Sequence, residues 1–212
     1  MTTVLVDYDS GNLHSAQKAF ERMARETDAG GVIVTNDPDV VAKADRIVLP
    51  GDGAFPHCRD ALFGRTALAE AITEAVTRRA VPFMGICVGM QMLATTGHEY
   101  TPTAGFGWIA GDIRKITPSN LAFKIPHMGW NDLIIDAPHP VLAGINSGAH
   151  AYFVHSFAMQ VTHPAERLAH VDYAGDITAI VGRDNIIGMQ FHPEKSQDAG
   201  LRMIGNFLRW TP

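Results

Sequence analysis

The sequence has only two cysteines, Cys58 and Cys87, among its 212 residues. Two cysteines cannot form the disulfide framework of a small secreted protein, and one bridge would be unusual in a domain of this size. The N-terminus, MTTVLVDYD, has no basic flank and no long apolar run, so it does not resemble a signal peptide. These features predict a reducing, cytoplasmic setting.

Long hydrophobic runs and basic clusters are also missing. The most apolar stretch, residues 80–94, is too short to span a membrane and is interrupted by Pro82, Gly85, Gly89 and Gln91. The formal net charge is −5 and lysine and arginine do not cluster, which argues against nucleic acid or an anionic membrane as a partner. The sequence also lacks a G-x-G-x-x-G fingerprint, a P-loop and a metal-ligand cluster, so we expect no cofactor and no metal.

The chain has enough apolar material, 46% hydrophobic and 18% charged residues, for one globular domain over residues 1–212. In its first half, β-rich runs alternate with helical patterns. The runs are residues 4–7, 32–35, 46–49 and 81–87, and the helical patterns are residues 13–23, 38–44, 62–79 (with a break near Gly64) and 88–93. This alternation predicts an α/β fold with a mostly parallel sheet and helices on both faces.

The pattern changes after Gly105 to shorter β-like pieces. They cover residues 107–116, 123–125, 133–135, 151–154, 157–161, 169–173, 178–181 and 186–191, and a helix over residues 197–210 ends the chain. We expect hairpins and edge strands, added in antiparallel fashion to the parallel core.

The strongest local signal is G-I-C-V-G at residues 85–89, between an apolar strand and a helix. This G-x-C-x-G has the spacing of a nucleophile elbow, in which flanking glycines relieve the clashes of a sharp turn. The elbow places Cys87 at a helix N-terminus, which favours the thiolate, and points the amide of Val88 toward a developing oxyanion. The alternative interpretation is a buried structural cysteine between two packing glycines. Cys58 has no such context, and we interpret it as structural or incidental.

A nucleophilic thiolate needs a proton partner, and M-Q-F-H-P-E at residues 189–194 offers one at the end of a predicted strand. His192 and Glu194 are two residues apart, which on an extended chain places both side chains on one face. The carboxylate could then orient and charge the imidazole, as in catalytic triads. Each residue alone would be interpreted as an ordinary histidine and a solvated charge.

These two motifs together resemble the class I (triad) glutamine amidotransferases, whose fold is flavodoxin-like, and the resemblance covers essentially the whole chain. Three further motifs resemble the glutaminase subunits of imidazole glycerol phosphate synthases: residues 7–13 (DYDSGNL), 126–131 (PHMGWN) and 152–157 (YFVHSF). The resemblance implies a nucleophile, a base that later acts as an acid, and an orienting carboxylate, namely Cys87, His192 and Glu194. It also implies a substrate site for glutamine at Gly51, Asp52, Gly53, Val88, Gln91, His155 and Ser156.

The same resemblance implies a heterodimer with a cyclase subunit of the (β/α)8-barrel type, which would use the released ammonia in histidine biosynthesis. The residues expected to face this partner are Asn12, Pro126, His127, Met128, Trp130, Tyr152 and Lys195. Without the resemblance, Gln91, His155 and Trp130 would be interpreted as ordinary helix, strand and core residues.

Asp52 departs from expectation, because an apolar residue is expected in this loop. A carboxylate beside a developing oxyanion is unfavourable, so we expect its side chain to point away and only its backbone to serve.

Three alternatives remain at this level. The triad could serve another acceptor, in the synthesis of anthranilate, aminodeoxychorismate, carbamoyl phosphate or pyridoxal phosphate. The scaffold could belong to a thiol peptidase or a γ-glutamyl hydrolase. The chain could also be a non-catalytic regulatory subunit that retains the fold.

Overall fold

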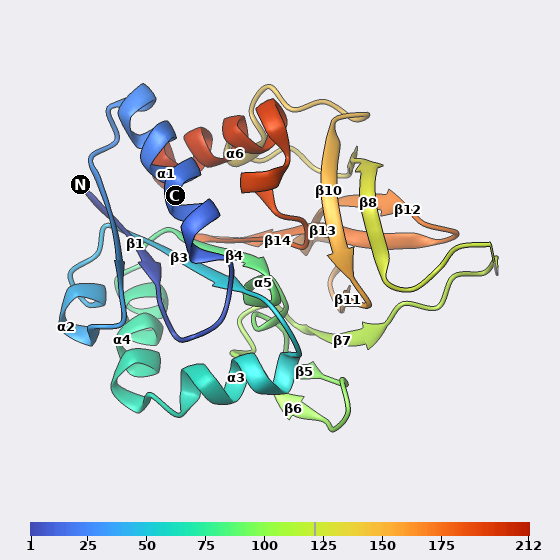
Figure 1. The fold of residues 1–212 in the computed structure, drawn as a ribbon, viewed down its shortest axis with the longest axis horizontal. Coiled ribbons are helices and arrows are strands. Elements are labelled where there is room, and N and C mark those ends of the chain that lie inside the picture. The colour runs from blue at the N-terminus through green and yellow to red at the C-terminus, as the bar shows by residue number, and fades with distance from the viewer. Residues whose placement is uncertain (121) are drawn as a thin grey trace.

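The computed structural model describes residues 1–120 and 122–212, which form three sheets and flanking helices (Figure 1). The main sheet has eight strands in the order β2-β1-β3-β4-β14-β13-β12-β9. Its first five strands are parallel, and β13, β12 and β9 continue it in antiparallel fashion. The parallel strands are β1 (Thr2–Val6), β2 (Gly31–Thr35), β3 (Arg46–Gly51), β4 (Phe83–Cys87) and β14 (Ile186–Met189). The antiparallel ones are β9 (Ile134–Ile135), β12 (Arg167–Asp172) and β13 (Asp176–Arg183).

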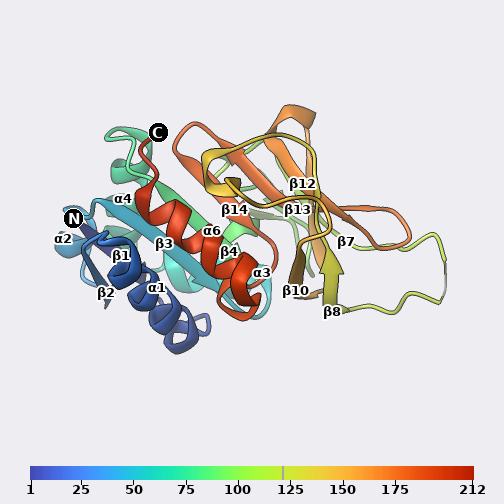
Figure 2. The same cartoon turned by 90° about the horizontal axis from the view of Figure 1, so that it is seen from above.

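Helices cover both faces of the parallel half. The helices α1 (Leu13–Thr27) and α6 (Gln197–Arg209) pack together on one face, and the other face carries α2 (Pro38–Val41), α3 (Phe55–Phe63), α4 (Thr66–Thr77) and α5 (Val88–Gln91) (Figures 1 and 2). Strands β3 and β4 are buried along their whole length. A strand covered on both faces is a continuous apolar run, which is why these two strands were visible in the sequence.

Two smaller sheets extend from the antiparallel side (Figure 2). One is a two-stranded ribbon of β8 (His127–Asp132) and β10 (His150–His155). The other has the order β11-β7-β5-β6, with β5 (Thr96–Gly97), β6 (Thr103–Ala104), β7 (Gly111–Lys115) and β11 (Phe157–Val161). The described residues also include three short 3-10 helices: η1 (Pro140–Leu142), η2 (Pro164–Glu166) and η3 (Pro193–Lys195).

The structure corrects five local predictions. Residues 186–191, expected among the hairpin and edge pieces, supply β14, which lies inside the main sheet and is parallel to β4. Residues 123–125 are not a strand, because the carbonyl and side chain of Asn120 accept the amides of Phe123 and Ala122 and hold a turn. The strand predicted over residues 107–116 shortens to β7. Strand β8 was not predicted. The helical region predicted over residues 62–79 begins already at Phe55, and its predicted break near Gly64 is confirmed as the boundary between α3 and α4.

The order β2-β1-β3-β4-β14 is the doubly wound order of flavodoxin-like proteins, so the expected fold class is confirmed. In such sheets, ligand sites form beyond the carboxyl ends of the parallel strands. Gly51, Cys87 and the segment after Met189 lie at this edge, on three adjacent strands. No helix of the described residues is long and apolar enough to cross a membrane.

Candidate active site

Cys87 is the last residue of β4 and has the strained backbone of a nucleophile elbow, with φ 54° and ψ −114°. The flanking glycines are required by close packing. A Cβ at Gly85 would lie 2.6 Å from the carbonyl oxygen of Gly89, and a Cβ at Gly89 would lie 1.8 Å from the carbonyl oxygen of Leu49. The turn therefore has room for a side chain at Cys87, but a side chain at Gly85 or Gly89 would clash with the backbone.

His192 lies beyond the end of β14, and its Nδ1 is 2.8 Å from Oε1 of Glu194. The predicted hydrogen bond between His192 and Glu194 is present, but the backbone that carries these two residues differs from the prediction. The strand ends at Met189, and Glu194 belongs to the 3-10 turn η3 rather than to an extended chain. The Glu194 side chain is only 2% exposed, so water does not compete for the imidazole.

His192 carries a positive charge at neutral pH. Burial lowers its pKa, but hydrogen bonds and charge interactions with Cys87 and Glu194 outweigh this and raise the pKa to about 10. His192 thus lies between the sulfur of Cys87 and the carboxylate of Glu194. Helix α5 has only four residues, so the helix N-terminus predicted at Cys87 belongs to a short helix.

A cavity of about 210 Å³ opens beside Cys87. It is smaller than the roughly 300 Å³ lower bound for pockets that hold drug-sized ligands, so it suits a free amino acid better than a peptide. Six of the seven residues predicted to bind substrate line it, Gly51 being the exception. The lining residues are Asp52, Gly53, Cys87, Val88, Gln91, Glu99, Pro126, Val154, His155, Ser156 and Phe157.

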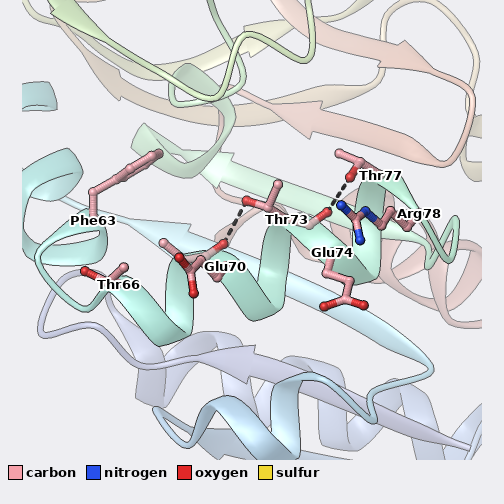
Figure 3. A pocket seen from close by; sticks show the side chains of 8 residues that line it. Phe63, Thr66, Glu70, Thr73, Glu74, Thr77 and Arg78 are labelled. Atoms are coloured by element: carbon pink, nitrogen blue, oxygen red, sulfur yellow. Dashed lines mark hydrogen bonds between the residues drawn. The ribbon is translucent and has the colours of Figure 1, made fainter.

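A larger surface hollow of about 530 Å³ lies along α4 and shares no lining residue with the cavity beside Cys87 (Figure 3). The hydroxyls of Thr73 and Thr77 in it donate to carbonyls of their own helix. It contains no cysteine or histidine among its lining residues, and it carries no catalytic constellation.

The loop after β3 places its backbone, and not the Asp52 carboxylate, toward neighbouring side chains. The Asp52 residue is exposed. Its carbonyl oxygen accepts hydrogen bonds from Ser10 Oγ at 2.8 Å and from Cys58 Sγ at 3.2 Å, and its amide donates to Ser10 Oγ at 3.4 Å. Burial raises the pKa of the Cys58 thiol, which therefore stays protonated and able to donate.

Sequence reasoning missed several residues of this site. Ser10 was overlooked because it is 42 residues from Asp52 in sequence. Cys58 is only six residues from Asp52, but it contacts the loop from helix α3, and no local motif marked that contact. Glu99 lines the cavity and accepts the amide of Phe55 at 2.8 Å. Gln190, whose Nε2 is 3.9 Å from Cys87 Sγ, could have been found, because it lies two residues before His192 in the quoted motif.

Six of the seven residues predicted to face a partner are exposed or half-buried. Met128 and Trp130 alternate along β8 with exposures of 64% and 47%, and Trp130 packs edge-on against Tyr152 of β10, with ring centroids 5.8 Å apart. The others are Asn12, Pro126 and Lys195. Helix α1 contacts η3, and η3 contacts β10, so the elements that carry these residues adjoin one another.

His127 is the exception, because it is only 2% exposed. It points to the inner face of the β8–β10 ribbon, where its Nδ1 lies 2.9 Å from Nε2 of His155. Its ring therefore does not reach the surface at which a partner was predicted, because alternate residues of a strand face opposite ways.

Comparison with known proteins adds to this geometry. The model of a family described as glutamine amidotransferase class-I matches residues 4–210. Two proteins described as imidazole glycerol phosphate synthase subunit HisH are similar over their whole length. The one from Ruegeria pomeroyi is 65% identical and the one from Cereibacter sphaeroides 68% identical, each over 212 residues that cover 100% of both chains.

Solved structures agree on the fold. A structure described as a glutamine amidotransferase superposes with a TM-score of 0.73 at 17% identity, covering 98% of this chain and 99% of the other. A glutamine amidotransferase from Thermotoga maritima gives a TM-score of 0.63 at 14% identity, covering 92% of this chain and 76% of the other. At these identities the structures support the fold alone. On the family match over residues 4–210 and the full-length relatives, this chain belongs to the class-I glutamine amidotransferases.

Proposed function

We propose that this chain hydrolyses glutamine with Cys87, His192 and Glu194 and delivers the ammonia to a cyclase subunit, as the glutaminase half of an imidazole glycerol phosphate synthase. Glutamine hydrolysis follows from the family and from relatives at 50–68% identity over the full length, all described as subunit HisH. The hydrogen-bonded His192–Glu194 pair beside the elbow cysteine is the observation that carries the residue roles.

In the proposed cycle, the Cys87 thiolate attacks the side-chain amide carbon of glutamine and forms a carbon–sulfur bond. The oxygen becomes an oxyanion, held by the amide of Val88 and by one amide of the loop at residues 51–53. The His192 imidazolium gives its proton to the departing nitrogen, which leaves as ammonia from a γ-glutamyl thioester. Neutral His192 then takes a proton from water, the hydroxide attacks the thioester, and glutamate leaves while the thiolate is restored.

The cavity offers groups for the ends of the substrate. Glu99 places a carboxylate in it, which complements the α-ammonium of an amino acid. Gln91 and Ser156 add neutral hydrogen-bonding groups to the same cavity. A free thiol nucleophile must stay reduced, which supports a cytoplasmic setting for the enzyme.

The partner is proposed to dock on the outer face of the β8–β10 ribbon. Met128, Trp130 and Tyr152 form an apolar, aromatic patch there, of the kind that anchors protein interfaces. Pro126 adjoins both regions, since it is exposed and also lines the cavity. A (β/α)8-barrel cyclase seated on this patch would lie beside the cavity in which ammonia forms.

The isolated chain is proposed to have low activity. The Asp52 amide, one candidate oxyanion donor, is turned to Ser10 in this structure. Gly53 has a φ of 104°, a conformation that suits glycine and permits reorientation of the loop. Docking of the loaded partner would then complete the oxyanion hole.

The test is glutamate release by the wild type and by Cys87→Ala, each alone and with a cyclase partner and its nucleotide substrate. We expect turnover that depends on Cys87 and rises by orders of magnitude with the loaded partner. Equal rates for the wild type and Cys87→Ala under all conditions would overturn the proposed function.

A further inference from the structure

Two buried histidines beside the cavity, His127 and His155, have protonation states that are fixed by their neighbours. Nδ1 of His155 lies 2.9 Å from the carbonyl oxygen of Phe157, which can only accept, so this nitrogen carries the proton. In the neutral ring Nε2 of His155 is then an acceptor, and His127 Nδ1, 2.9 Å away, must donate to it. His127 Nε2 is left as the acceptor for the side-chain amide of Asn131, 3.3 Å away.

The neutral state of both rings is supported by their surroundings. Burial lowers the pKa of each ring to about 4, and no carboxylate contacts either of them among the described residues. His127 stacks on Phe153 and packs against Tyr173, with centroid distances of 4.7 and 4.1 Å. Each imidazole thus packs against aromatic side chains, donates a hydrogen bond from Nδ1 and accepts one at Nε2.

The Phe157 carbonyl continues the connection toward the sulfur. It also accepts from Nε2 of Gln91 at 3.1 Å, and the same Nε2 donates to Oε1 of Gln190 at 3.1 Å. With its oxygen so engaged, Gln190 turns its own Nε2 to Cys87 Sγ, 3.9 Å away. Gln190 is fully buried, and its amide orientation is therefore set by Gln91.

We propose that His127 and Gln190 are positioning residues of the glutaminase site, as members of a hydrogen-bond network that extends from strand β8 to the Cys87 sulfur and meets at the Phe157 carbonyl, which accepts from both sides. The network runs through Asn131, His127, His155, the Phe157 carbonyl, Gln91, Gln190 and Cys87. Gln190 holds the Cys87 sulfur by donating to it. His127 holds His155 and the Phe157 carbonyl, and through them the Gln91 side chain in the cavity. This inference rests on the proposed function for its effect on turnover.

His127 links the hydrogen-bond network to strand β8, whose outer face is the proposed docking surface. It lies on the inner face of β8, and the next residue along the strand, Met128, lies on the exposed outer face. A shift of β8 on docking would therefore act on the first side chains of the network. The two positioning residues should also differ in their kinetic effects. Gln190 contacts the nucleophile and should affect kcat, whereas His127 acts on the substrate cavity and should affect KM.

The first test is nuclear magnetic resonance of the full chain with ¹⁵N-labelled histidine. At pH 7 we expect His127 and His155 both to be neutral and protonated on Nδ1. In Asn131→Asp the carboxylate can no longer donate, so we expect His127 to gain a proton on Nε2. A neutral Nε2–H form or a charged ring at His127 or His155 in the wild type would overturn the proposed hydrogen-bond network. This readout does not depend on catalysis, so it separates failure of the inference from failure of the proposed function.

The second test uses kinetics with the loaded partner. Gln190→Met keeps a similar volume but has no hydrogen-bond donor and only a weak acceptor. We expect kcat to fall about three- to tenfold, the effect of one lost hydrogen bond. Alkylation of Cys87 by iodoacetamide, followed by mass spectrometry of its peptide, should also move to higher pH, because the thiolate has lost a donor. A role confined to packing would leave the alkylation profile unchanged.

His127→Phe keeps the stacking on Phe153 and Tyr173 but removes the hydrogen bonds. We expect KM for glutamine to rise about three- to tenfold with a smaller change in kcat. The matched control is His139→Asn, at a half-buried histidine that packs on Trp210 away from the site, and it should keep wild-type kinetics. Wild-type kcat, KM and alkylation profiles in both Gln190→Met and His127→Phe would overturn the proposal.

Discussion

Two histidine sites in this molecule have opposite electrostatics. Despite burial, Cys87 and Glu194 raise the pKa of His192 to about 10, whereas burial lowers the pKa of His127 and His155 to about 4. All three rings are buried. The difference in pKa comes from the hydrogen-bond partners. His192 contacts the acidic side chain of Glu194, whereas His127 and His155 contact neutral acceptors and each other. Burial removes water, and the neighbouring groups then decide which charge state is stable.

The greatest loss should come from removing the charged site. Cys87→Ala should abolish glutamate release, and His192→Asn should lower kcat by at least about 10³-fold, because thiolate formation and both proton transfers depend on it. Single-turnover glutamate release with the loaded partner measures both. A His192→Asn enzyme within tenfold of the wild type would contradict the role of His192.

Glu194→Gln tests the carboxylate without changing the shape of the side chain. Loss of its charge should lower the pKa of His192, and the amide can stabilise the wrong tautomer, so we expect kcat to fall by about 10²-fold or more. Glu194→Asp, which keeps the charge, should be less impaired. The pH profile of kcat for the two variants measures this difference. Equal losses of kcat in both would show that the shape of the Glu194 side chain matters and its charge does not.

The outer and inner faces of β8 should also be separable. Trp130→Ala removes the aromatic anchor of the exposed patch, and we expect partner affinity to fall by about 2 kcal/mol or more, as at interface hot spots. Titration of the cyclase subunit by calorimetry measures this loss. His127→Phe, on the inner face, should bind the partner with wild-type affinity. Weakened binding in His127→Phe and not in Trp130→Ala would reverse the assignment of the two faces.

A weaker effect concerns the pH dependence of folding. The unfolded chain binds protons at His127 and His155 below their ordinary pKa of 6.5, whereas the folded chain does so only near 4, so stability falls as pH decreases from about 6.5 to 4. The contribution of His192 is opposite: it is complete below about pH 6.5 and is lost as pH rises through 10. Urea unfolding from pH 4 to 10 measures both slopes, and His127→Phe should flatten the acidic one.

Much of the fold was accessible from local sequence. Apolar runs that alternate with helical patterns predicted β1, β2, β3 and β4, and β3 and β4 are apolar because they are buried along their length. Residues 186–191 were expected among the hairpin and edge pieces, but they supply β14, a parallel strand beside β4. The antiparallel half was less accessible. Residues 123–125 form no strand and β8 was missed, since its polar and aromatic residues alternate between a buried and an exposed face of a two-stranded ribbon.

Local sequence was enough to predict the elbow at Cys87 and the closeness of His192 to Glu194, because glycines flanking one residue and a separation of two residues are local constraints. Three-dimensional packing was needed to show that Ser10 and Cys58 hold the Asp52 backbone, that His127 faces inward, and that Gln190 reaches the sulfur. Apart from the contact of Cys58 with Asp52, six residues away, these contacts join segments 28 to 103 residues apart, and they depend on strand register and burial. No local periodicity encodes such contacts, so the same residue type becomes a charged partner at position 192 and a neutral link at position 127.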